Sequence, residues 1–130
     1  MTESEPRIRV LIVDDHPLFR MGIRSHLRSH NKIEVVGEAG DGKTAVQLVR
    51  ELVPDVVLMD ITLPRMSGIL ATLMIKAEFP HVAIIGLSIH DSQQTIQAMG
   101  EAGSCMYLTK EATPDNLLLA IKAALEERHH

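Results

Sequence analysis

The chain has 130 residues, of which 45% are hydrophobic and 23% charged, which is typical of a single globular domain. Its net charge of −4 argues against a nucleic-acid-binding surface, and its single cysteine, Cys105, excludes an intrachain disulfide and fits a reducing compartment. No apolar run approaches the roughly 18–20 residues that span a bilayer, and the acidic N-terminus is unlike a signal peptide. We therefore expect a cytoplasmic domain that does not enter the membrane or bind DNA by itself.

Five apolar segments predict β-strands, and a segment with helical signals follows each of them. The strands are expected at residues 7–13, 33–39, 56–60, 82–87 and 104–108, and the helices at 17–29, 42–52, 67–79, 92–101 and 114–126. Asp41, Asp91 and Thr113 are expected to cap three of the helices, and Gly103 is expected to end one. This alternation predicts an α/β fold, a five-stranded parallel sheet with helices on both faces.

The predicted elements leave only short tails. We expect one domain over residues 7–126, a disordered N-terminal tail at 1–6 and a C-terminal tail at 127–130. The final two residues, His129 and His130, are consistent with the remnant of a purification tag.

Polar side chains stand where four of the apolar strands end: Asp14–Asp15, Asp60, Ser88 and Lys110. In open α/β sheets, ligands bind at the carboxyl ends of the strands. Three carboxylates gathered there need a counter-cation, and their oxygen atoms favour Mg²⁺. A divalent ion beside a nucleophilic aspartate suits phosphoryl transfer, to which Lys110 would add a positive charge and Ser88 a hydroxyl. Each residue alone could be a cap, a turn or a surface residue, but their coincidence at strand ends favours a site.

Four separated motifs, in this order along the chain, resemble the receiver domain of bacterial two-component response regulators. They are VLIVDDHP (residues 10–17), VVLMDITLPRMSG (56–68), IIGLSIHD (84–91) and MYLTKEATPDNL (106–117). The resemblance covers residues 7–126 and implies the flavodoxin-like (βα)5 topology of that family.

The resemblance also implies roles for the residues at the strand ends. Asp60 would accept a phosphoryl group from the phosphohistidine of a sensor histidine kinase. Asp14, Asp15, Asp60 and the backbone carbonyl of Thr62 would bind Mg²⁺ or Mn²⁺, and Lys110 would contact the phosphoryl group. Such a domain is not an enzyme beyond its own phosphotransfer and dephosphorylation.

A switch pair follows from the same resemblance. Ser88 would move towards the phosphoryl group, and Tyr107 would turn inward behind it. The altered surface would then control the output of the protein.

The motif details resemble the LuxR-type (NarL/FixJ-like) subgroup, whose members usually carry a helix-turn-helix domain after the receiver. The indicative segments are DDHPLFR, LSIHD and the Glu-Ala-Thr-Pro that follows Lys110. The general family pattern has proline directly after this lysine, whereas Glu111 stands here. The chain stops after the fifth helix, so it is either a stand-alone receiver or, as we favour, an excised domain. DNA contact and control of transcription would belong to the absent C-terminal domain.

Two surfaces are candidates for protein contacts. Leu70, Leu73 and Met74 follow helical i, i+3, i+4 spacing on the outer face of the third helix, which predicts an interface with a partner or a second copy. On the last helix we expect three residues to face away from the core and to contribute to a phosphorylation-dependent homodimer: Leu118, Lys122 and Leu125.

Three other functions fit the sequence less well. A haloacid-dehalogenase-type phosphatase would have a second aspartate two residues after the nucleophile, where this chain has Thr62. A flavin-binding module would need a phosphate-binding loop after the first strand and aromatic residues for stacking, but Asp14–Asp15 follow that strand and tryptophan is absent. A degenerate receiver that signals only by contact would not need the phosphorylation residues, all of which are present.

Overall fold

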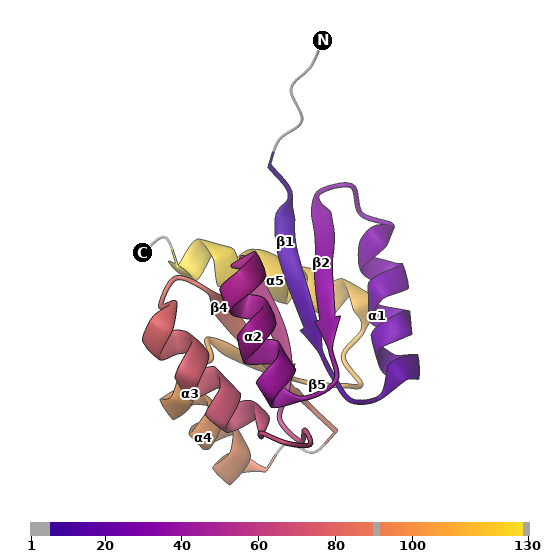
Figure 1. Ribbon diagram of the computed structural model, residues 1–130. Helices are drawn as coiled ribbons and strands as arrows, with labels where there is room; N and C mark the ends of the chain where they lie inside the picture. Colours follow the sequence, from indigo (N-terminus) through magenta and orange to yellow (C-terminus); the bar gives the residue numbers. More distant parts are fainter. Residues whose placement is uncertain (1–5, 90–91, 129–130) are drawn as a thin grey trace.

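The computed structural model describes residues 6–89 and 92–128 and has the predicted α/β fold. Five parallel strands form one sheet in the order β2–β1–β3–β4–β5. Figure 1 shows β1 and β2 side by side in this sheet. The strands are β1 (Ile8–Val13), β2 (Ile33–Ala39), β3 (Val56–Asp60), β4 (Ala83–Ser88) and β5 (Met106–Thr109). The helices are α1 (Pro17–Arg28), α2 (Gly42–Leu52), α3 (Gly68–Glu78), α4 (Gln93–Ala102) and α5 (Pro114–Arg128).

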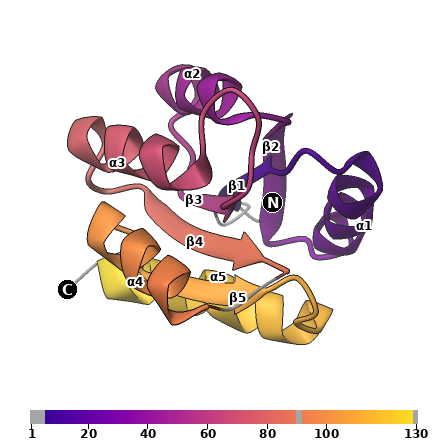
Figure 2. The ribbon, with the colours of Figure 1, turned by 90° about the horizontal axis from the view of Figure 1, so that it is seen from below.

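Each face of the sheet has its own apolar core. Along β1, Val10 and Ile12 belong to the core with α1 and α5, whereas Leu11 and Val13 belong to the core with α2, α3 and α4. Successive strand residues point to opposite faces, so a strand with helices on both sides is apolar at every position. Figure 2 shows α2 and α3 on one side of the sheet and α1 on the other. These two cores hold the carboxyl ends of the central strands in place.

The predicted helix caps that lie within the described residues agree with the structure. Asp41 and Thr113 accept backbone N–H hydrogen bonds at the starts of α2 and α5. Gly103 ends α4 in the left-handed region with φ of 118°. The predicted cap Asp91 lies outside the described residues, and the hydroxyl of Ser92 caps α4.

The prediction that Leu118 faces away from the core is wrong. Its side chain is 9% exposed and belongs to the core beneath α5, whereas the neighbouring Leu119 is 65% exposed. α5 packs against β3, β4, β5 and α1. Because neighbours lie on several sides of this helix, its buried face is wide enough to include Leu118 as well as Leu117 and Ile121. Lys122 is exposed and Leu125 is half-buried, as expected for the outer part of the helix.

The ends of the chain differ slightly from the predicted tails. Residues 1–5 and 129–130 lie outside the described part, and α5 continues to Arg128, two residues beyond its predicted end. Within the described residues, no helix has both the length and the apolar character to cross a bilayer.

Gly68 allows α3 to begin directly against the end of β3. A Cβ atom at this position would lie 2.1 Å from the backbone oxygen of Asp60 and 2.9 Å from the Cα atom of Ile61. The Gly68 N–H also donates to the Ile61 carbonyl over 2.9 Å. Any larger residue would therefore displace the backbone that carries Asp60.

We expect Gly68→Ala to lower the free energy of unfolding by at least about 2 kcal/mol, because the clash is with backbone and not with a flexible side chain. Urea denaturation followed by circular dichroism would measure the change. Gly100→Ala is the matched control, since the Cβ added there would meet no atom within 4 Å beyond its chain neighbours and the backbone of α4 itself. That control should gain about 0.5–1 kcal/mol from helix propensity, and similar effects of the two substitutions would contradict the prediction.

Candidate functional site

The carboxyl ends of β1, β3, β4 and β5 bring the predicted site residues to one edge of the sheet. The register of β1 against β3 places Asp14 beside Asp60. The backbone N–H of Lys110 donates to the carbonyl of Ser88 over 2.8 Å, which anchors the residue after β5 to the end of β4. The sequence prediction that these side chains share one edge is therefore confirmed.

Lys110 forms ion pairs with two buried aspartates. Its Nζ atom lies 2.6 Å from Asp14 Oδ2 and 3.2 Å from Asp60 Oδ2. Only 8% of the Lys110 side chain is exposed, compared with 0% for Asp14 and 4% for Asp60. The ammonium group also lies 4.7 Å from the centroid of the Phe19 ring. Two ionised carboxylates buried side by side repel each other. The positive charge of Lys110 between them offsets this repulsion.

The pKa values of Asp60 and Lys110 are both raised. Burial is the main cause for Asp60, the charge of Asp14 adds to it, and Lys110 only partly opposes the rise. Burial alone would lower the pKa of Lys110, but the hydrogen bond to Asp14 and the charge of Asp60 outweigh it. The surroundings therefore disfavour the ionised form of the Asp60 carboxyl and favour the ionised form of the Lys110 amine.

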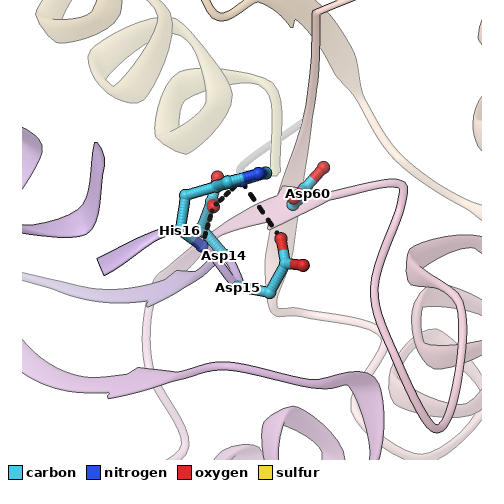
Figure 3. Close-up of side chains that lie close together, drawn as sticks. All are labelled: Asp14, Asp15, His16 and Asp60. Atoms are coloured by element: carbon cyan, nitrogen blue, oxygen red, sulfur yellow. Dashed lines mark hydrogen bonds and ion pairs between the residues drawn. The ribbon is translucent and has the colours of Figure 1, made fainter. Parts of the chain in front are cut away.

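Asp15 completes an acidic cluster that is open to solvent on one side. Its side chain is 36% exposed, and one of its oxygen atoms lies within 4.8 Å of ligand atoms from Asp14, His16 and Asp60 (Figure 3). The backbone N–H of Thr62 donates to Asp60 Oδ1 over 3.2 Å. The proposed use of the Thr62 carbonyl as a metal ligand stays a prediction.

Three residues of α1 and its N-cap contact the site but are not among those predicted from the sequence. His16 lies 3.0 Å from Asp14 Oδ1 through its Nδ1 atom, Phe19 packs beneath Lys110, and the guanidinium group of Arg20 donates to the backbone oxygen of Asp14. The position of His16, directly after two aspartates at a strand end, was the available signal for it. Nothing in the sequence indicates that Phe19 meets Lys110, because the two are brought together only by the packing of α1 near the end of β5.

The residues of the predicted switch pair occupy neighbouring strands. Ser88 is 6% exposed at the end of β4. Tyr107 is half-buried on β5 and packs against the core on the α2, α3 and α4 side. Their movement upon phosphorylation stays a prediction.

The apolar stripe on α3, formed by Leu70, Leu73 and Met74, is exposed as expected. The exposed fractions are 48%, 49% and 37%. Ala71 and Ile75 face the core, so the outer and inner faces of this helix are both apolar. An interface on the outer face stays a prediction.

Comparison with known proteins identifies the family to which this site belongs. A family model described as the response regulator receiver domain matches residues 10–122. The chain belongs to the response regulator receiver domain family. The transcriptional regulatory protein LiaR of Bacillus subtilis is 42% identical over 117 residues, which are 90% of this chain and 56% of that protein.

Solved structures of receiver domains resemble the whole fold. A LuxR-family response regulator from an Aurantimonas species has a TM-score of 0.88 at 38% identity, covering 94% of this chain and 87% of that chain. The receiver domain of the response regulator NarL from Mycobacterium tuberculosis has a TM-score of 0.90 at 30% identity, covering 94% of this chain and 98% of that chain. These likenesses agree with the LuxR-type subgroup predicted from the motifs.

The chain spans about half the length of the curated relatives that it matches. It is a receiver domain of two-component signalling, a class that binds Mg²⁺ at an acidic phosphorylation site and interacts with histidine kinases. The Asp14, Asp15 and Asp60 cluster fits such a site.

We expect Asp60→Asn to stabilise the receiver domain near neutral pH. Because the folded state raises the pKa of Asp60, ionisation above that pKa costs stability, whereas below the ordinary value of 3.8 the carboxyl is protonated in both states. The gain in urea midpoint should therefore be largest at pH 7 and shrink as the pH falls towards 3.8. The exposed Glu101→Gln variant controls for the loss of one negative charge, and a gain that does not depend on pH would contradict the assignment.

Proposed function

We propose that this receiver domain takes a phosphoryl group from the phosphohistidine of a sensor histidine kinase onto Asp60. The observation that carries the proposal is the pairing of one lysine with two buried aspartates at the sheet edge. A structural ion pair would need one carboxylate, whereas this site holds a second buried carboxylate and a third that faces solvent. Such an excess of negative charge suits the binding of a cation, and the cation would in turn offset the negative charge of a phosphoryl group.

In the proposed reaction, a carboxylate oxygen of Asp60 attacks the phosphorus atom. A P–O bond forms while the P–N bond of the phosphohistidine breaks, and the imidazole of the kinase leaves. Lys110 already lies 3.2 Å from Asp60 Oδ2, close enough for its ammonium group to bind the incoming phosphoryl oxygens. The burial of Asp60 limits access of water to the acyl phosphate that results.

The donor set of the cluster fits a hard divalent cation. Asp14, Asp15 and Asp60 provide carboxylate oxygens close enough to share one ion, and Asp15 is open to solvent, which suits an ion that keeps part of its water shell. When bound, Mg²⁺ or Mn²⁺ would neutralise negative charge on the phosphoryl oxygens. The Thr62 carbonyl would be a further ligand.

Phosphorylation would then change the surface around β4 and β5. The added negative charge would attract the hydroxyl of Ser88 and the ammonium group of Lys110, and the half-buried Tyr107 would turn inward. The protein would remain a signalling domain without enzymatic turnover beyond its own phosphotransfer and dephosphorylation, and it would act in the cytoplasm.

The output would be the control of transcription through a helix-turn-helix domain beyond this chain. LiaR is a transcriptional regulatory protein, and DNA interaction is described for the RcsB response regulator of Salmonella typhimurium, which is 25% identical with a TM-score of 0.82. The exposed Lys122 and the half-buried Leu125 on α5 would contribute to a phosphorylation-dependent homodimer.

Incubation with acetyl phosphate and Mg²⁺ should add one phosphoryl group, seen in an intact-mass spectrum. Asp60→Ala should abolish the adduct, because no other aspartate in the cluster occupies the central strand β3. Asp115→Asn, at the exposed start of α5, is the matched control and should be labelled like the original chain. If no adduct forms while a control receiver is labelled, the domain signals by contact alone.

We further propose that the exposed stripe of Leu70, Leu73 and Met74 on α3 is a surface for protein contact. Large apolar side chains that adjoin one another on a helix surface are unusual unless they are covered. The cation of Lys76 does not shield the stripe, because its Nζ atom donates to the carbonyls of Pro80 and Val82. A second copy of the chain is the occupant that can be tested with this domain alone.

The triple substitution Leu70→Gln, Leu73→Gln, Met74→Gln should reduce self-association, measured by sedimentation equilibrium with and without acetyl phosphate. Leu119→Gln controls for loss of a single exposed leucine on α5, where the exposed fraction is 65%. An unchanged association constant for the triple variant would reject the stripe as a self-association surface.

A further inference from the structure

His16 is a nitrogen donor within the acidic cluster. Its Nδ1 atom lies 3.0 Å from Asp14 Oδ1 and 3.2 Å from Asp15 Oδ1. Figure 3 shows the nitrogen-bearing end of the ring turned towards the carboxylates, with dashed lines to Asp14 and Asp15 and with Asp60 beside it. One ligand atom from each of these four residues lies within 4.8 Å of the others. The metal ligands proposed above are all oxygen atoms and do not include this imidazole.

The backbone holds His16 at the edge of the site, where its ring contacts the carboxylates and is largely exposed to solvent. His16 is the N-cap residue of α1 in an extended conformation with φ of −99° and ψ of 105°, and its side chain makes no capping hydrogen bond. The following Pro17 favours this extended conformation. The backbone N–H of His16 donates to Asp14 Oδ1 over 2.7 Å, which ties the residue to the carboxylate next to its ring. The side chain is 65% exposed, so the ring can adjust by small rotations.

The distances within the cluster are close to those of ligands on a single ion. Nitrogen and oxygen ligands lie about 2.0–2.2 Å from a transition metal, so two ligands on opposite sides of one ion are roughly 4.4 Å apart. The four ligand atoms of the cluster all lie within 4.8 Å of one another, so slight contraction would bring all four groups onto one centre. Imidazole nitrogen is a preferred ligand of Co²⁺, Ni²⁺ and Zn²⁺, whereas Mg²⁺ prefers oxygen.

We propose that His16 joins Asp14, Asp15 and Asp60 as a fourth side-chain ligand for divalent transition metals, whereas Mg²⁺ is bound by the carboxylates without it. The inference rests on the metal site of the proposed function. It adds a reason for the site to bind some divalent metals more tightly than others. The charges agree with it, because three ionised carboxylates are balanced by a divalent ion together with the Lys110 ammonium group. A neutral imidazole adds a ligand without disturbing this balance.

A metal ion bound at this site must compete with Lys110 for Asp14. Its Nζ atom lies 2.6 Å from Asp14 Oδ2 and 3.4 Å from His16 Nδ1. An ion that gains an imidazole ligand replaces the lysine at Asp14 more readily than one bound by oxygen alone. The difference in affinity between transition metals and Mg²⁺ should consequently be larger at this site than at a site with three carboxylates alone.

The test is a pair of metal titrations on the original chain and on His16→Phe, which keeps a planar ring but removes both nitrogens. Co²⁺ binding would be followed by its visible absorption, and Mg²⁺ binding by isothermal titration calorimetry. We expect the substitution to weaken Co²⁺ binding by about tenfold or more, with a changed absorption spectrum, and to change Mg²⁺ binding by less than about twofold. His81→Phe, at an exposed histidine between α3 and β4, controls for adventitious Co²⁺ binding and should change neither.

A second measurement does not depend on the variant. In the original chain, Zn²⁺ should shift the imidazole ¹⁵N resonances of His16, whereas Mg²⁺ should leave them nearly unchanged. Equal losses of Co²⁺ and Mg²⁺ affinity in His16→Phe, or ¹⁵N resonances that do not respond to Zn²⁺, would overturn the inference while leaving the phosphoacceptor site intact. If the original chain bound neither Mg²⁺ nor Co²⁺, the metal site of the proposed function would itself be wrong.

Discussion

The ion pairs that join Lys110 to Asp14 and Asp60 are the interaction on which the functional edge of this domain depends. They place one cation between two carboxylates that are almost completely buried, at distances of 2.6 and 3.2 Å. Removing charges from water costs several kcal/mol for each ion, and attraction offsets this cost only when the geometry is good. The sheet supplies that geometry, because its parallel strands bring the ends of β1, β3, β4 and β5 to one edge, with β1 directly beside β3.

The register itself depends on two apolar cores, one on each face of the sheet. Val10 and Ile12 are anchored under α1 and α5, and Leu11 and Val13 are anchored under the helices of the other face. A slip of β1 by one residue would exchange these two sets and move Asp14 away from Asp60. Close backbone contact at Gly68 adds a second constraint, since it holds the start of α3 against the residue that follows β3. Packing far from the site therefore controls the distances within it.

The same electrostatics makes the site suitable as a switch. Burial raises the pKa of Asp60 and so disfavours its ionised form, and Lys110 is shared between Asp14 and Asp60. A change in charge at Asp60 would alter the balance between those partners. Lys110 directly follows β5, and the half-buried Tyr107 lies on this strand, which packs beside α4. Coupling between the site and a distant surface requires contacts that differ between two states. We propose Lys110, which contacts both Asp14 and Asp60, for this role.

The sequence by itself determined the succession of strands and helices along the chain and the family. It also determined the strand-end positions of Asp14, Asp60, Ser88 and Lys110. It could do so because apolar runs, turn residues and motifs are local, and because carboxyl ends of parallel strands meet at one edge. Only the tertiary structure decided that Leu118 is buried, since the width of the covered face of α5 depends on the neighbours that pack around it. It also decided that the imidazole of His16 reaches the carboxylates, because the direction of a side chain at a helix start follows from backbone angles and packing that no spacing in the sequence records.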